Sequence, residues 1–327
     1  MNPTRLTVCL LAACLLSAIG CSSSSSTPAG AAAPPSKTMI EPRILGLYRG
    51  DTGAAVPWHQ MIADMAEADV VLIGEQHGHL VGLEAAATIF DDLTPRAPSI
   101  ALSMEFFERD QQSHIDDYLT GITDEETFKK ATNRNPGSYP DGHRRMVETA
   151  KNAGRPVIAA NAPRRYVRLA RTDGFDRFND LTPEQRRLVD LPNSLTTGRY
   201  RDQFFELMGG MGGHGGEDDA SMTEEERAAK AAETEAMIET FFRSQNVWDA
   251  TMANAIVGAL ESGSQPVVHV VGQFHSDYRG GLTERVQARA PRARVITYSV
   301  VDTWSDELRD EDRDRADYVM YVGKRSE

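Results

Sequence analysis

The amino-acid sequence predicts an α/β fold: a single domain with a largely parallel central sheet flanked by helices. Two observations lead to this prediction. Short runs rich in Val and Ile are apolar throughout, without the alternation of a half-exposed strand, which is typical of strands covered on both faces. Most of these runs are separated by longer amphipathic stretches, and alternating strands and helices indicate a parallel sheet.

Each predicted strand is a Val/Ile-rich run that ends at turn or polar residues. In chain order the runs are DVVLI (69–73), SIALSM (99–104), RPVIAA (155–160), QPVVHVV (265–271), ARVITYSVV (293–301) and DYVMYV (317–322). The stretches between them carry apolar residues at helical spacing. They predict helices at roughly 79–93, 109–120, 142–153, 163–172, 238–262 and 279–290.

Residues 207–237 interrupt this alternation. The segment opens Gly-rich and continues as an acidic, alanine-rich helix candidate. We interpret it as an insertion with a mobile front half, inside a domain that spans 43–325. Met208, Met211 and His214 are candidates for a metal or haem contact, but flexible Gly-rich loops usually have no such role.

Residues 1–20 have the pattern of a secretory signal, with Arg5 followed by the apolar run LTVCLLAACLLSAIG. This run is shorter than the roughly 20 apolar residues of a membrane span. The small residues before Cys21 are similar to a bacterial lipoprotein cleavage site, where the Cys is acylated; Cys14 is a second candidate, but cleavage there would leave a stunted apolar core. The Ser/Ala/Pro-rich residues 21–42 predict a tether from lipid to domain.

This leader predicts an exported protein of the bacterial cell envelope that reaches the membrane through a lipid anchor. Ser22, rather than an Asp, follows the acylated Cys, which by analogy favours the outer membrane over the inner one. All three cysteines (Cys9, Cys14 and Cys21) lie in the leader. The domain therefore has no disulfide, thiolate metal site or cysteine nucleophile.

The charge balance is acidic. The chain has 35 Lys and Arg against 48 Asp and Glu residues, and loss of Arg5 with the leader brings the formal charge to −14. Such a balance argues against nucleic acid as a partner. It leaves room for a small anionic ligand that is bound by local arginines.

Polar residues that could bind a ligand or act as acids and bases follow four of the predicted strands. Gly74, Glu75 and His77 follow the first, Glu105 the second, Asn161 and Arg164 the third, and Gly272 and His275 the fourth. In open parallel sheets, ligands bind in the crevice beyond the carboxyl ends of the strands. We therefore expect these residues to share one crevice.

The first and fourth strand ends share the pattern Gly-x-x-His, in GEQH and GQFH. Gly lets the chain turn sharply and approach a bound group, and the His three residues later can face the same pocket. Imidazoles and carboxylates together bind a divalent metal, or they act as acid and base around a substrate. The predicted metal ligands, and equally the predicted catalytic groups, are Glu75, His77, Glu105 and His275.

Other polar residues have more ordinary interpretations. His79 caps the following helix or lies in solvent, and Asn161 is interpreted as a helix N-cap with Pro163 in the first turn. Arg164, with Arg165 and Arg168, offers guanidinium groups to an anion or forms a solvated basic face. The remaining histidines have no such context: His59, His114, His143 and His269, of which His269 lies inside a predicted strand and is interpreted as a core residue.

Several motifs are absent from the sequence. It has no His-Glu-x-x-His helix, no Gly-x-Ser-x-Gly elbow, no phosphate-binding Gly-rich loop with Lys, and no Cys-x-x-Cys-His. Their absence argues against classical zinc proteases, serine hydrolases, nucleotide enzymes and c-type cytochromes.

Five ordered blocks of this sequence resemble the ChaN-like haem-binding lipoprotein family. They are ADVVLIGEQHGH, IALSMEFFERDQQSHIDDYLTG, RPVIAANAPRR, NVWDATMANAI and PVVHVVGQFHSDYRGGL, and the resemblance runs from about residue 44 to 300. It implies kinship with the wider Tiki, TraB and erythromycin-esterase superfamily. By motif, Gly74, Glu75, His77, Glu105, Gly272 and His275 occupy the signature positions of the family.

The resemblance implies an exported, lipid-anchored protein of haem and iron uptake, with haem bound in a known case between two subunits, so that a homodimer is expected. It further implies a tyrosine on the iron and basic or histidine groups, such as Arg164, near the propionates. The candidate tyrosines are Tyr48, Tyr139, Tyr166, Tyr200 and Tyr278. The alternative is a hydrolase, with or without a divalent metal, that uses Glu75, His77, Glu105 and His275. Phe106 and Phe107 line the haem pocket or belong to the core.

Overall fold

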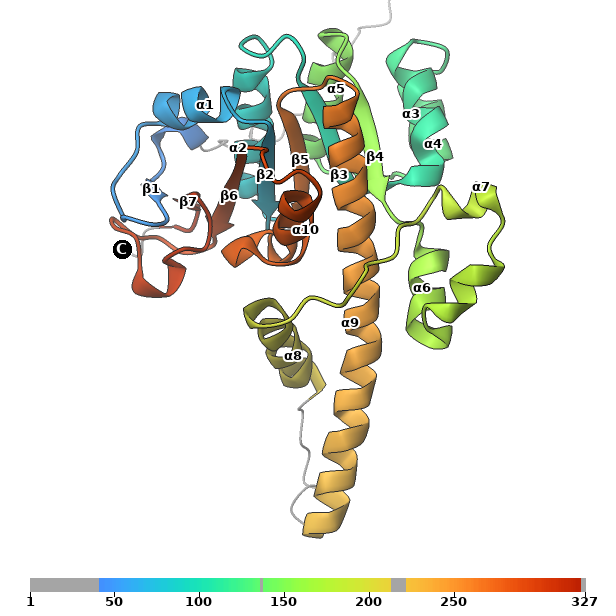
Figure 1. Cartoon of the computed structure of the whole chain (residues 1–327). Helices are drawn as coiled ribbons and strands as arrows, with labels where there is room; N and C mark the ends of the chain where they lie inside the picture. Colours follow the sequence, from blue (N-terminus) through green and yellow to red (C-terminus); the bar gives the residue numbers. More distant parts are fainter. Residues whose placement is uncertain (1–40, 136–137, 213–221, 325–327) are drawn as a thin grey trace, which may run out of the picture. The chain divides into compact units, whose positions relative to one another are not determined.

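Seven strands form one sheet in the order β1-β7-β6-β2-β5-β3-β4 (Figure 1). The computed structural model describes residues 41–135, 138–212 and 222–324. The strands are β1 (Leu47–Arg49), β2 (Val70–Glu75), β3 (Ala101–Glu108), β4 (Val157–Asn161), β5 (Val267–Gly272), β6 (Val295–Val301) and β7 (Tyr318–Tyr321). All neighbouring pairs are parallel except β1 and β7. The predicted α/β fold with a largely parallel sheet is confirmed.

The helices occupy most of the chain between the strands. They are α1 (Trp58–Ala66), α2 (Leu80–Leu93), α3 (Gln112–Leu119), α4 (Glu125–Ala131), α5 (Asp141–Asn152), α6 (Arg164–Asp173), α7 (Pro183–Arg186), α8 (Arg199–Gly212), α9 (Glu224–Glu261) and α10 (Gly281–Arg289). None of the described helices is long and apolar enough to cross a membrane. The predicted signal, Cys21 and most of the tether, together with His214, lie outside the described residues.

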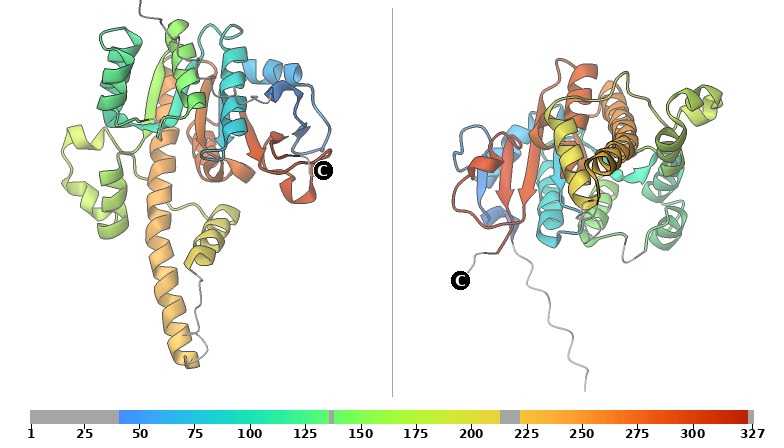
Figure 2. Two further views of the ribbon diagram at one scale, coloured as in Figure 1. Left: turned by 180° about the vertical axis from the view of Figure 1, so that it is seen from behind. Right: turned by 90° about the horizontal axis from the view of Figure 1, so that it is seen from below.

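The sheet is covered on both faces, which explains why its strands are apolar throughout. Along β2, Val71 and Ile73 point to one face and pack in the cluster that includes Phe90 of α2. Val70 and Leu72 point to the other face and pack against residues of α9 and α10, among them Met252. Figures 1 and 2 show α2 and α5 on one side of the sheet, and α9 and α10 on the other. Complete burial of such side chains is the main favourable contribution to folding.

The predicted strands all occur, within a few residues of their predicted ends. The prediction missed β1, since three residues are too few for a pattern, and it missed α1, α4, α7 and α8. The acidic helix candidate in 207–237 and the helix predicted at 238–262 form one helix, α9, which begins at Glu224 because Thr223 caps it in a capping box with Glu226. Its first turns are exposed and therefore lack the apolar periodicity on which the prediction depended.

Glu105 lies inside β3 and not after it, which corrects the predicted strand end. Pairing of β3 with β4 is irregular between Met104, opposite Ala159, and Glu108, opposite Asn161. The β3 segment is thus two residues longer than its partner, which makes it a bulge. Bulges re-aim side chains, and this one directs Glu105 to the carboxyl edge of the sheet, where β2 and β5 end.

Candidate functional site

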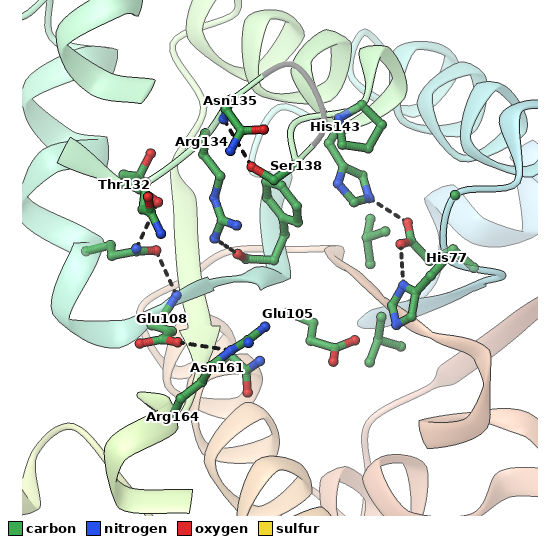
Figure 3. Close-up of a pocket in the computed structure, with 18 residues that line it drawn as sticks. His77, Glu105, Glu108, Thr132, Arg134, Asn135, Ser138, His143, Asn161 and Arg164 are labelled. Carbon is green, nitrogen blue, oxygen red and sulfur yellow. Dashed lines mark hydrogen bonds and ion pairs between the residues drawn. The ribbon is translucent and has the colours of Figure 1, made fainter. Parts of the chain in front are cut away.

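A cavity of about 700 Å³ opens at the carboxyl edge of β2, β5, β3 and β4 (Figure 3). The strand-end residues Glu75, His77, Glu105 and Asn161 line it, as does Arg164 at the start of α6. Its volume lies within the range of small-molecule sites, roughly 300–1,000 Å³. The cavity is thus lined by residues from three of the four predicted strand ends. Of the fourth, Gly272 and His275 contact Glu105 without lining the cavity themselves.

Glu75 is a buried carboxylate between two histidines. Its Oε1 lies 3.0 Å from Nδ1 of His77, and its Oε2 lies 2.6 Å from Nε2 of His143. Burial alone would raise the pKa of Glu75, but the hydrogen bonds from His143 and His77 outweigh it and lower that pKa to about 2. Glu75 is therefore ionised at neutral pH and accepts a hydrogen bond from each ring.

His77 presents its second ring nitrogen to the cavity. About 70% of its side chain is exposed, and the hydrogen bond to Glu75 raises its pKa. Its Nε2 lies beside Gly272, where a Cβ would come within 2.8 Å of it. Gly272 is thus required for close approach of the His77 imidazole, which belongs to the other Gly-x-x-His motif; the pattern did not predict this contact. The Glu75 contact fixes Nδ1 as the donor of the neutral ring, and in that form Nε2 has the lone pair.

His143 is a functional candidate that sequence reasoning missed. It lies on α5, far from any strand end in the sequence, and it is buried against Phe106, with ring centroids 4.5 Å apart. The preceding residue, Gly142, lets α5 pack closely on α2, because a Cβ there would lie 2.7 Å from the carbonyl oxygen of Leu83. That Gly is the signal that could have indicated a close helix contact.

His275 has a different environment, although its motif matches that of His77. It is buried, with Nδ1 2.5 Å from Oδ1 of Asp249 and Nε2 3.7 Å from Oε1 of Glu105. Burial would lower the pKa of His275, but the charges of Asp249 and Glu105 outweigh it and raise that pKa to about 9. The expectation that both histidines face one pocket is wrong: His77 lines the cavity, and His275 reaches it only through Glu105.

Glu105 connects the cavity to this buried group. Its Oε2 accepts a hydrogen bond of 2.7 Å from the backbone N–H of Gly272, and its Oε1 faces His275. Figure 3 shows its carboxylate between Glu108 and His77. Gly74 supports the same region, because a Cβ there would lie 2.9 Å from Oγ of Ser276 and 3.1 Å from the backbone of Gln273. Both signature glycines therefore permit close packing at the site.

The structure also shows the roles of the three remaining residues that follow strands, His79, Asn161 and Arg164. His79 caps α2: its Nδ1 accepts the N–H of Gly82 at 3.0 Å, and its Nε2 lies 3.2 Å from Asp302. Asn161 is not an N-cap, since Pro163 takes that position and the Asn161 side chain accepts from its neighbour's N–H. Arg164 lines the cavity with a side chain 90% exposed, and its Nε lies 3.8 Å from Glu108.

None of the five candidate tyrosines lines the cavity. Tyr48 lies on β1, the edge strand farthest from β4 in the sheet, and Tyr166 is buried on α6. Tyr200 donates to Asp249, and Tyr278 donates to the carbonyl of Glu311. Tyr139 comes nearest, stacked on Phe106 with ring centroids 5.8 Å apart. The tyrosine on iron that the resemblance implied therefore has no counterpart in this cavity.

Within the described ranges, no group of three or more His, Cys, Asp or Glu side chains is arranged to hold a metal ion. The predicted set of Glu75, His77, Glu105 and His275 is not assembled, because His275 is turned toward Asp249. His269 is a core residue as expected, with Nδ1 2.8 Å from Oγ of Ser103. Its burial lowers its pKa to about 3, so it is neutral.

The fold and the cavity define an α/β protein with a ligand pocket at the carboxyl edge of its parallel sheet. The profile of the family described as "Haem-binding uptake, Tiki superfamily, ChaN" matches residues 61–286, and the chain belongs to this family. No curated protein matches the chain.

One solved structure shares its fold, and two others have a more distant similarity. A ChaN structure of Campylobacter jejuni, described as binding haem cofacially, has a TM-score of 0.62 at 16% identity, over 84% of this chain and 96% of that chain. The type III effector HopBA1 has a TM-score of 0.44 at 14% identity, over 88% and 100% of the two chains. An erythromycin esterase in its open conformation has a TM-score of 0.41 at 11% identity, over 78% and 77%.

Proposed function

We propose that this protein binds haem in the cavity at the carboxyl edge of the sheet, with His77 as the residue that approaches the iron. The orientation of His77 carries the proposal: Nδ1 contacts Glu75 at 3.0 Å, so that in the neutral ring Nε2 has the lone pair, on an exposed side chain. Metal-ligating histidines almost always donate their other N–H to a carboxylate or carbonyl in this way. Bound haem would supply an iron centre, and His77 would be the side chain that holds it.

The walls of the cavity fit the other parts of a haem. Phe106 is partly exposed and contributes apolar surface to the cavity, and the buried Val270 and Val271 lie behind its lining. Arg134 and Arg164 contribute guanidinium groups suited to its propionates. A volume of about 700 Å³ admits a ligand of this size at least in part, with the rest at the open mouth.

Membership of a haem-binding uptake family supports haem as the ligand. The C. jejuni relative that binds haem supports it further. We extend the proposal to a role in haem and iron uptake by an exported lipoprotein, anchored through Cys21, in the outer rather than the inner membrane. The predicted homodimer is part of this proposal, and light scattering with and without haem tests it.

The test is a haem titration of the full-length protein, monitored by Soret absorbance. We expect saturation at one haem per chain, and His77→Ala should weaken binding at least about tenfold and shift the Soret band. Arg168→Gln, a change on the exposed face of α6 outside the cavity, is the matched control. A titration without a Soret change, or one that His77→Ala leaves unaltered, would refute the proposal.

The second candidate function is the hydrolase. The observation in its favour is the same Glu75–His77 pair, because a carboxylate that orients an exposed imidazole is also the geometry of a general base. Glu105 lies near enough to act as a second acid or base in the cavity. If haem does not bind, an ester and amide substrate screen with His77→Ala and Glu105→Gln tests this alternative. Turnover that survives both changes would exclude it.

A further inference from the structure

His143 lies two hydrogen bonds away from the free nitrogen of His77. Its Nε2 donates to Oε2 of Glu75 at 2.6 Å, and Oε1 of the same carboxylate accepts from Nδ1 of His77 at 3.0 Å. Figure 3 shows the two labelled rings on opposite sides of this carboxylate. Among the described residues, the side chain of Glu75 has no other hydrogen-bond partner. The three groups therefore form one chain, His143–Glu75–His77, that runs from the core to the cavity.

The inner end of this chain is fixed by the packing of α5. On that helix, Thr149 donates to Oδ1 of Asp91 on α2 at 2.6 Å, and Nε of Arg145 donates to Oδ2 of the same residue at 2.8 Å. His143 itself is buried, so it presents its N–H from a packed position. The side chain of His77, in contrast, is about 70% exposed and depends on its hydrogen bond with the carboxylate for its orientation.

A purely structural role does not explain a histidine at position 143. Its Nδ1 is buried and has no hydrogen-bond partner in the described part of the chain. A buried polar atom without a partner costs about 1–3 kcal/mol, which a phenylalanine in the same place would avoid. Departures of this kind from good packing are expected where a residue has a function. The contact with Glu75 is the feature of His143 that a phenylalanine would lose.

The chain matters because a free imidazole has its proton in the wrong place for binding through Nε2. In water the neutral ring prefers the tautomer with the proton on Nε2, and in that form Nε2 has no lone pair to donate. Glu75 reverses this preference, since an ionised carboxylate opposite Nδ1 requires a proton there. It can do so only while the carboxylate is held in place. Because His143 holds Oε2, loss of that bond would let the carboxylate rotate away from His77.

We propose that His143 is a positioning residue for His77: by holding Glu75, it keeps the proton of the neutral His77 ring on Nδ1 and leaves Nε2 for the ligand. Although His143 lines the cavity, one of its ring nitrogens is committed to Glu75 and the other is buried, so it acts through Glu75. The inference deepens the haem-binding function proposed above. It rests on that function for the identity of the ligand and adds how the binding imidazole is prepared.

The first measurement is the position of the ring proton of His77 in the haem-free protein. Two-bond ¹H–¹⁵N correlation spectra of the ¹⁵N-labelled full-length protein distinguish the neutral tautomers, at an alkaline pH where the ring is neutral, and the spectrum of His77→Ala assigns the signals. We expect the Nδ1–H form in the wild type and in His143→Gln, whose amide keeps an N–H donor for Glu75. His143→Phe should convert the ring to the Nε2–H form. His269→Gln, a change of a buried histidine outside the cavity, should leave it unaltered.

The second measurement is haem affinity, by Soret titration in a double-mutant cycle. His143→Phe should weaken binding about tenfold, at the lower end of the range for groups that orient a metal ligand, and His143→Gln should keep most of the affinity. In the Glu75→Ala background, His143→Phe should have no further effect, because the group through which it acts is gone. An equal loss in both backgrounds would mean that His143 contacts the ligand directly, which would overturn the proposal.

An unchanged Nδ1–H tautomer in His143→Phe would overturn the positioning role even if haem binds as proposed, as would an Nε2–H tautomer in the wild type. If the tautomer changes as expected but the wild type binds no haem, the positioning role holds and haem is the wrong ligand, since the spectra are recorded without it. Thermal unfolding of each variant shows whether it folds, and His143→Leu carries the test if His143→Phe does not.

Discussion

Substitution of Gly272 by Ala should damage the site while leaving the fold intact. Gly272 has an ordinary backbone conformation, with φ −54° and ψ 130°, so Ala is tolerated there without backbone strain. The new Cβ would lie 2.8 Å from Nε2 of His77, against an ordinary contact of at least 3.4 Å. The imidazole must therefore retreat by about 0.6 Å or rotate away, which breaks its hydrogen bond with Glu75.

The size of the effect follows from the exposure of His77. Since about 70% of the side chain is already in solvent, it can rotate out at a loss of less than about 1 kcal/mol in unfolding free energy. Haem affinity should fall about tenfold or more, which corresponds to about 1.4 kcal/mol. Urea unfolding and Soret titration of the same preparation measure the two quantities.

Gly74→Ala is the informative comparison. Its Cβ would lie 3.1 Å from the Gln273 backbone and from the Tyr298 carbonyl oxygen, neither of which can rotate away. It should therefore cost about 1–3 kcal/mol of stability, the usual range for overpacking. The reasoning is refuted if Gly272→Ala binds haem with wild-type affinity and spectrum, or if it destabilises the protein more than Gly74→Ala does.

Two further predictions concern groups outside the cavity. His79→Ala should cost about 0.5–2 kcal/mol of unfolding free energy through loss of the α2 cap, His79→Asn should restore most of it, and neither should change haem affinity; reduced affinity in both would mean that His79 touches the ligand. Stability should be greatest near pH 6.5. Because the pKa of His269 is lowered to about 3 in the folded chain, the unfolded chain binds this proton more readily. The free energy of unfolding therefore decreases as pH falls from 6.5 toward 3. The charge of His275, with its pKa raised to about 9, stabilises the fold below pH 6.5, and this contribution is lost as pH rises to about 9. In urea unfolding across pH, His269→Gln should flatten the acid side and His275→Gln the alkaline side; unchanged curves would contradict both assignments.

The fold was largely predictable because its determinants are local. Continuous apolar runs such as 70–73 are buried on both faces, and that burial is what their pattern records. Elements without such a record were missed, as β1 was with its three residues, or were not joined: the first turns of α9 are exposed and polar, so the apolar pattern did not connect them to the rest of the helix. Where capping or an edge pairing determines an element, apolar periodicity contains no information about it.

The site was predictable at strand ends and not beyond them. Glu75, His77 and Gly272 meet because parallel strands bring their ends together, whatever the side chains are. His143 and Arg134 enter from α5 and from the loop before it, and their positions depend on how α5 packs on α2. The difference between His77 and His275 also results from tertiary packing, since Asp249 on α9 contacts His275 and keeps it out of the cavity lining. Tertiary packing of this kind cannot be read from a motif of four residues.

The most direct test of the central claim is the location of the bound haem. Ferric haem broadens NMR signals of nearby nuclei, so amide spectra of the isotope-labelled full-length protein with and without haem report its position. We predict loss of the signals of Gly78 and Asn161, which line the cavity, and unchanged signals of Leu47 and Tyr48 on β1. Broadening centred on another surface, or no broadening at saturating haem, would contradict the account.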